Sequence, residues 1–105
     1  MRIQYLFNSS GEWIAFKIGP YVFDTNGDWI GWTPWNDDYV VTPEGEYLGT
    51  IWAGNRLFYF YDHEYRGYPG YPVYPDYPGY PGYPGDGGYF PLPSGATDVN
   101  ISKYF

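Results

Sequence analysis

The chain repeats one pattern three times without a gap, as YLFNSSGEWIA (Tyr5–Ala15), YVFDTNGDWIG (Tyr21–Gly31) and YVVTPEGEYLG (Tyr39–Gly49). Each copy begins with a tyrosine and carries a glycine, an acid and an aromatic residue in succession. A pattern copied at intervals of 16 to 18 residues is one supersecondary unit used several times. Runs rich in Tyr, Val, Ile, Phe and Trp flank each glycine, as is typical of β-strands. The repeat therefore predicts three β-hairpins.

The three copies together identify the turn at the centre of each hairpin. Asn26-Gly27 alone would suggest a type I′ turn, which needs a positive φ at both central residues. Pro43 in the third copy excludes that turn, because proline holds φ near about −65°. A type I turn followed by a left-handed glycine accommodates all three sequences. We therefore expect Gly11, Gly27 and Gly45 to share one backbone conformation and to close a three-residue loop.

This loop also fixes which residues face each other across a hairpin. The pairs expected in the first copy are Phe7 with Trp13, Leu6 with Ile14 and Tyr5 with Ala15. The other copies follow the same register, so each repeat tyrosine is expected opposite an alanine or a glycine. Side chains alternate between the two faces of a strand, and one face then collects the aliphatic residues Leu6, Ile14, Val22, Ile30, Val40 and Leu48. We expect this face to form the core, and the aromatic face to be either a second buried layer or an exposed platform.

A fourth copy is present in split form. Arg56–Tyr61 has the pattern of its first strand, and Gly88–Leu92 resembles the second, although Pro91 confines that strand to an edge or a bulge. Thr97–Ile101 alternates polar and apolar residues, and its pairing with Arg2–Tyr5 would close the structure.

With these repeats the chain resembles the bacterial four-fold β-flower family, small proteins built from about four hairpins around a pseudo-symmetry axis. The resemblance covers about residues 3–62 and the aromatic-rich segment near the end. It implies a fold and no active site, because the family is functionally uncharacterised. The predicted fold class is all-β, a small barrel-like ring of antiparallel β-hairpins with pseudo-fourfold internal repeats. We expect one domain over residues 1–105, with a Tyr-Pro-x low-complexity insertion at about 66–88.

Composition limits the classes of partner. The chain has 105 residues and no cysteine, so neither disulfides nor a thiolate zinc site can supplement its small core. A net charge of −7 argues against nucleic acid or an anionic membrane surface as partner. There is no visible signal peptide and no run of about 20 apolar residues that could span a bilayer. We therefore expect a cytoplasmic protein.

The insertion contains Tyr-Pro at every third position, with tyrosines at Tyr68, Tyr71, Tyr74, Tyr77, Tyr80 and Tyr83. Polyproline II has three residues per turn and rises about 3.1 Å per residue, which would align the six rings on one ridge, about 9 Å apart. Three interpretations remain open: a disordered loop, docking on the chain's own aromatic face, or docking on another copy to give oligomers. The Pro-Gly steps could also form isolated type II turns.

Catalytic chemistry has little support. The only histidine, His63, stands between two acids in the sequence, and we expect it to be a solvated surface residue. Glu12, Asp28 and Glu46 occupy equivalent positions beside the turns, so they are expected to lie apart around the ring. Asp24–Asp28 places oxygen ligands at alternate positions, but its glycine comes too early for an EF-hand loop, and the hairpin turn accounts for it. We predict no catalytic residue, no cofactor and no metal.

The leading functional prediction is a non-enzymatic interaction or scaffold protein that contacts itself or another protein through its aromatic β-face and Tyr-Pro segment. The alternative is a carbohydrate-binding module, in which Trp32 and Trp35 stack on a glycan and nearby Asn and Asp side chains bind hydroxyls. An uncharacterised enzyme is the third interpretation. The predicted interaction surface comprises Trp32, Trp35 and the six Tyr-Pro tyrosines.

Overall fold

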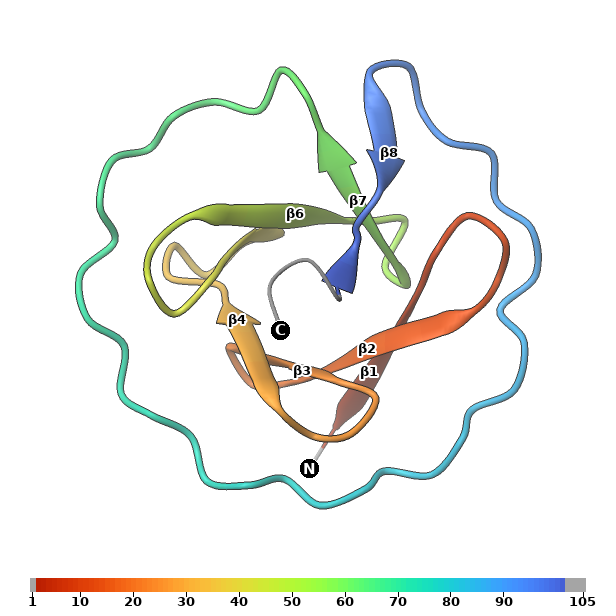
Figure 1. The fold of residues 1–105 in the computed structure, drawn as a ribbon, viewed down its shortest axis with the longest axis horizontal. Helices are drawn as coiled ribbons and strands as arrows, with labels where there is room; N and C mark the ends of the chain where they lie inside the picture. Colours follow the sequence, from red (N-terminus) through yellow and green to blue (C-terminus); the bar gives the residue numbers. More distant parts are fainter. Residues whose placement is uncertain (1, 102–105) are drawn as a thin grey trace.

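The computed structural model describes residues 2–101, and in that range the chain is an all-β domain. Its strands are β1 (Ile3–Phe7), β2 (Trp13–Ile18), β3 (Tyr21–Asp24), β4 (Trp29–Trp32), β5 (Tyr39–Val41), β6 (Tyr47–Trp52), β7 (Arg56–Phe60) and β8 (Ala96–Asp98). Each strand pairs antiparallel with the next, and β1 also pairs in parallel with β7, where Phe7 lies beside Arg56. This contact closes β1–β7 into a barrel, with β8 added beside β7 (Figure 1). The predicted fold class is confirmed.

The three repeat turns have the predicted geometry. Gly11, Gly27 and Gly45 adopt φ values of 90°, 84° and 93°. Each glycine N–H donates to the carbonyl three residues earlier, at 2.9–3.1 Å, as in a type I turn. The left-handed glycine then lets the second strand leave the turn in register with the first.

The predicted register is right beside the turn and wrong further along each hairpin. Phe7 faces Trp13 as expected, but Leu6 pairs with Ala15 and Tyr5 with Phe16. Ile14 is an extra residue on the second strand, which is a β-bulge. The same shift recurs in the other repeats, where Val22 pairs with Gly31 and Val40 with Gly49. The repeat tyrosines therefore do not lie opposite alanine or glycine; their partners are Phe16, Trp32 and Thr50.

Barrel closure explains why each hairpin carries this bulge. A bulge bends and twists its strand, and a sheet that curls into a small barrel needs such bends at its corners. In the first two repeats the tryptophan beside the bulge also donates its indole N–H to a backbone carbonyl, from Trp13 to Ala15 at 2.8 Å and from Trp29 to Gly31 at 2.7 Å. The bulge thus supplies a partner for a partly buried indole.

The barrel interior is filled by the aliphatic residues, as predicted. The core cluster consists of Leu6, Ala15, Val22, Ile30, Val40, Leu48, Ile51, Leu57 and Val99, with Ile14 partly buried against it. Gly31 and Gly49 leave room for these side chains. A β-carbon at Gly49 would lie 2.9 Å from both the Phe58 carbonyl oxygen and Val99 Cγ2, so only glycine fits there.

The aromatic face is a second layer whose side chains are buried or half-buried, which favours the first of the two alternatives left open by the sequence. Phe16, Phe23 and Phe58 follow inward-facing residues in their strands and therefore point out of the barrel. All three are buried nonetheless, and the rings of Phe16 and Phe23 stack with their centroids 5.4 Å apart. Another part of the chain must cover them.

The fourth hairpin consists of β7 and β8 rather than the predicted pair of segments. β7 lies where expected, but residues 88–92 form no strand, and the antiparallel partner of β7 is β8. The expected pairing of residues 97–101 with β1 is also wrong. One edge of β7 pairs with two strands. Its start lies beside β1, where the Phe7 N–H donates to the Asn55 carbonyl at 2.9 Å, and its end pairs with β8.

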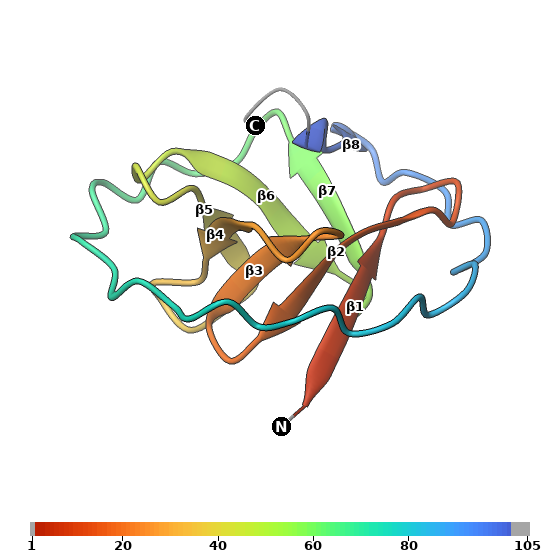
Figure 2. The ribbon, with the colours of Figure 1, turned by 60° about the horizontal axis from the view of Figure 1, so that its bottom comes forward.

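The loop of this fourth hairpin encircles the barrel. Residues 62–93, here called the belt, contain no helix or strand; they leave the end of β7, run around the outside of the molecule and return to β8 (Figures 1 and 2). The Tyr61 N–H donates to the Gly95 carbonyl at 2.9 Å where the two ends of the belt meet. The predicted insertion at 66–88 is the central part of this belt.

Candidate interaction surface

One end of the belt is held by an ion-pair cluster. Arg66 lies 2.6 Å from a carboxylate oxygen of Asp37 and 2.6 Å from one of Glu64. Its guanidinium carbon lies 4.4 Å above the Tyr39 ring centroid and 5.3 Å from that of Trp35. Partial burial opposes the ionisation of Asp37, but the hydrogen bonds it accepts and the charge of Arg66 outweigh it and lower the pKa of this carboxyl.

The other end of the belt is held by a buried arginine. Arg56 at the start of β7 is only 4% exposed. Its guanidinium donates to the Asn8 and Gly88 carbonyls at 2.8 Å and to the Gly87 carbonyl at 2.6 Å. The rings of Phe7 and Phe90 lie 5.7 and 5.3 Å from its guanidinium carbon. Arg56 thus joins the belt to the end of β1.

Between these ends, the first tyrosine of each repeat donates its hydroxyl to a belt carbonyl. The three bonds are Tyr39 to Glu64 at 2.7 Å, Tyr21 to Val73 at 2.8 Å and Tyr5 to Pro81 at 3.1 Å. The accepting carbonyls follow one another at nine and then eight residues. The belt therefore passes the repeats in the reverse of their order in the chain, with about three Tyr-Pro-x triplets for each repeat.

The turn glycines show the same period. Tyr68 lies over Gly45 and Tyr77 over Gly27, where a β-carbon would come within 3.1 and 2.7 Å of the respective rings. At the third turn the Gly87 N–H donates to the Gly11 carbonyl at 2.8 Å. Tyr68 and Tyr77 are nine residues apart, which is three Tyr-Pro-x triplets. Three Tyr-Pro-x triplets of the belt thus span the distance from one hairpin turn to the next.

Aromatic contacts fill the space between belt and barrel. Trp29 meets Tyr74 edge to face at 4.9 Å, and Trp13 meets Tyr80 and Tyr83 at 5.9 and 6.0 Å. Such pairs contribute about 0.5–1.5 kcal/mol each beyond the area they bury. The segment therefore docks on its own aromatic face, one of the three interpretations of the sequence.

His63 takes the equivalent position on the third repeat. Its ring stacks on Tyr47 at 3.7 Å with an interplanar angle of 16°, and its Nδ1 donates to the Phe60 carbonyl at 2.7 Å. It is half-buried, so the expectation of a solvated surface histidine is wrong. Tyr39 and Tyr47 both contact this ring. Burial raises the pKa of Tyr39, although the charge of Arg66 acts in the opposite direction. Burial also raises the pKa of Tyr47, although its hydrogen bonds act in the opposite direction.

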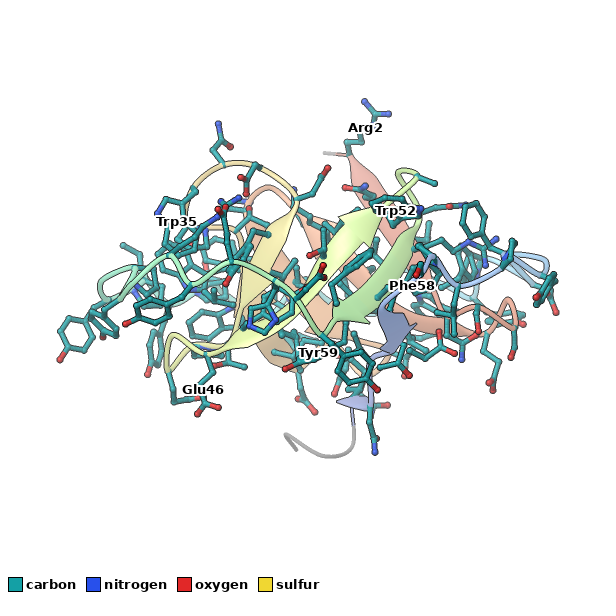
Figure 3. The ribbon with its side chains drawn as sticks, turned by 90° about the horizontal axis from the view of Figure 1, so that it is seen from above. Arg2, Trp35, Glu46, Trp52, Phe58 and Tyr59 are labelled. Atoms are coloured by element: carbon teal, nitrogen blue, oxygen red, sulfur yellow. The ribbon has the colours of Figure 1, made fainter. Side chains whose placement is uncertain are left out.

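The outer side of the belt is formed by tyrosine rings. The prolines of all six triplets are partly buried, whereas the six tyrosines are 59–90% exposed. The expected continuous polyproline II helix does not form, because the glycines of the Tyr-Pro-Gly triplets adopt φ values of 79–92°, as position i+2 of a type II turn requires. The side chains of the belt project from the rim of the molecule (Figure 3). The tyrosine ridge, as we call it, comprises Tyr68, Tyr71, Tyr74, Tyr77, Tyr80 and Tyr83. Tyr68 and Tyr71 are closer than the expected 9 Å, with centroids 5.7 Å apart.

The two tryptophans predicted to bind a glycan are less exposed than the tyrosines of this ridge. Both Trp32 and Trp35 are half-buried, and the indole nitrogen of Trp32 is inaccessible. Trp35 meets the Tyr39 ring edge to face at 5.4 Å and lies beside the Arg66 guanidinium. A sugar that stacked on Trp35 would compete with Arg66, so carbohydrate binding gains no support from this geometry and stays a prediction.

Sequence reasoning missed the residues that fix the belt. Arg56 and Arg66 lie outside the repeats, and nothing in the sequence distinguishes them from other scattered cations. Tyr5, Tyr21 and Tyr39 did carry a signal, because a tyrosine at the same place in three copies indicates a shared role for its hydroxyl. That role became evident only with the position of the belt.

Comparison with protein-family models, curated proteins and solved structures gave no match. The resemblance to the β-flower family therefore stays an expectation. Within residues 2–101, no helix is long and apolar enough to cross a membrane, and no group of three or more His, Asp or Glu side chains is placed to hold a metal ion.

Proposed function

We propose that this chain is a non-enzymatic interaction protein whose contact surface is the tyrosine ridge, with a second copy or another protein as partner. The proposal rests on one observation: the belt is fixed to the barrel while its tyrosine side chains stay exposed to solvent. The belt is held at both ends and at every repeat, yet its six tyrosine rings remain largely exposed.

A surface of this kind is suited to binding for two physical reasons. Tyrosine contributes a large contact area and a hydroxyl at a small cost in side-chain entropy, which is why it is enriched at interfaces. A segment that is already docked on the barrel also loses little backbone freedom when it binds. The barrel thus serves as the frame that presents the ridge.

Site-specific photo-crosslinking in the cells that make the protein tests this proposal. Tyr71, which is 90% exposed, is replaced by p-benzoylphenylalanine, and Tyr89, which is 78% exposed but outside the ridge, receives the same replacement as a control. We expect discrete adducts from position 71 and none from position 89. An adduct of twice the 12.2 kDa chain mass identifies self-association. No adduct from position 71, or equal adducts from both, contradicts the proposed function.

A further inference from the structure

We propose that the tyrosine ridge binds an arginine-rich, extended segment of its protein partner. This inference rests on the proposed function and names the chemistry of the partner. It follows from how the molecule binds its own arginines, from the charges around the ridge and from the spacing of the rings.

The chain itself shows how its aromatic surface receives a guanidinium. Arg66 lies over Tyr39 and beside Trp35 while Asp37 and Glu64 accept its hydrogen bonds. Arg56 lies between phenylalanine rings and carbonyl oxygens. Aromatic faces and oxygen acceptors in combination suit the planar, weakly hydrated guanidinium better than the compact ammonium of lysine. The ridge offers the same combination on a larger scale.

Exposed acids lie along the ridge. Asp76 and Asp86 belong to the belt, and Glu12, Asp28 and Glu44 lie in or beside the turns that the belt covers.

The described cations do not neutralise these acids. Arg56 is buried, and Arg66 is paired with carboxylates. Arg2 and Lys17 line a cavity at one end of the barrel, and Figure 3 places Arg2 at the end opposite Glu46. The ridge is therefore an aromatic and acidic surface, complementary to a basic partner.

The spacing of the rings defines the form of that partner. Exposed tyrosines recur at every third residue of the belt, and the Tyr68 and Tyr71 ring centroids lie 5.7 Å apart. A partner segment that runs along the belt, with arginine at every third residue, would bring one guanidinium to each successive ring. Exposed cation–π contacts are weak singly, so binding draws on several rings at once.

Calorimetric titration of the full chain with a peptide of repeated Arg-Gly-Pro triplets tests the inference, with Lys-Gly-Pro and Glu-Gly-Pro peptides of equal length as comparisons. We expect the arginine peptide to bind more tightly than the lysine peptide, and the glutamate peptide not to bind. Removal of one ring in Tyr71→Ser should weaken the arginine peptide roughly two- to fivefold, as expected for one exposed cation–π contact.

Two control variants separate this mechanism from general charge attraction. Tyr71→Phe keeps the aromatic face and should retain affinity, whereas Tyr89→Ser removes an exposed tyrosine outside the ridge and should leave affinity unchanged. Equal affinity for the arginine and lysine peptides, or equal losses in Tyr71→Ser and Tyr89→Ser, overturns the inference. If the peptides fail while position 71 still gives adducts in cells, the proposed function stands and only the arginine chemistry is wrong.

Discussion

The two ends of the belt are both held by arginine, but the two anchors differ in kind. Arg56 is buried and donates to backbone carbonyls, whereas Arg66 is accessible to solvent and pairs with carboxylates. Bonds from a buried charge to fixed carbonyls depend on geometry and are hardly screened by salt. Exposed ion pairs depend on pH and ionic strength. We therefore expect changes of pH and salt to weaken the Arg66 anchor more than the Arg56 anchor.

The largest effect is expected from Arg56→Met. This change keeps much of the buried volume but removes three charge-assisted hydrogen bonds, and it leaves the Gly87 and Gly88 carbonyls without this donor. The free energy of unfolding should fall by about 3 kcal/mol or more. Urea denaturation measures the loss, and limited chymotrypsin digestion should show faster cutting after Tyr89. An unchanged urea midpoint would show that Arg56 is not an anchor.

A smaller loss at the same end is expected from Gly87→Ala. A β-carbon here would lie 2.5 Å from the Phe7 ring, so the belt must move away from β1 although Arg56 itself is unchanged. Overpacking of this kind typically costs about 1–3 kcal/mol. The control is Gly88→Ala, where the β-carbon meets open space and only the positive φ of 77° causes strain. A Gly87→Ala protein as stable as the wild type would contradict close packing of belt and barrel.

The third prediction concerns alkaline pH at the Arg66 end. Burial raises the pKa of Tyr39, whose hydroxyl donates to the Glu64 carbonyl. The folded protein therefore holds this proton more tightly than the unfolded chain, so the stabilisation is complete below about pH 10 and is lost as pH rises above that value. Urea midpoints at pH 9, 10 and 11 should fall for the wild type and fall less for Tyr39→Phe. Parallel decreases in the two proteins would argue against this role of Tyr39.

The smallest effect is expected from Asp37→Asn. Because Arg66 lowers the pKa of Asp37, the ion pair stabilises the fold above the unfolded pKa of about 3.9, and the contribution disappears as pH falls through the lower folded value. The pair is exposed, so the loss at neutral pH should be far below that of Arg56→Met. It should vanish at about 1 M salt, where the screening length is about 3 Å. A loss that persists in high salt would mean that Asp37 acts through packing.

The sequence predicted those features that depend on local chemistry. Pro43 excluded one turn type, and this was enough to fix the conformation of three glycines. The period of the Tyr-Pro triplets likewise predicted one exposed row of six rings. The predicted polyproline II backbone was wrong, because the glycines between the triplets adopt positive φ values.

Features that depend on barrel closure were not predictable in the same way. The extra residue at Ile14, Ile30 and Leu48 appears only when the hairpins must curve into one barrel, and each hairpin alone is consistent with the simpler register. The positions of Arg56 and Arg66 depend on where a distant segment passes, which no local pattern contains. His63 was misjudged for the same reason, since the ring on which it stacks lies 16 residues earlier in the chain.

The closed path of residues 62–93 makes the short strand β8 more important than its three residues suggest. The encirclement ends where Tyr61 meets Gly95, so the loop can lift away from the barrel only if this junction opens or the loop slides past the hairpin tips. Belt and final strand thus form one cooperative unit, and local opening exposes such units together. In hydrogen exchange, the amides of Tyr61 and Ala96 should acquire deuterium at the same rate as the belt amide of Gly87, which is bonded to the Gly11 carbonyl.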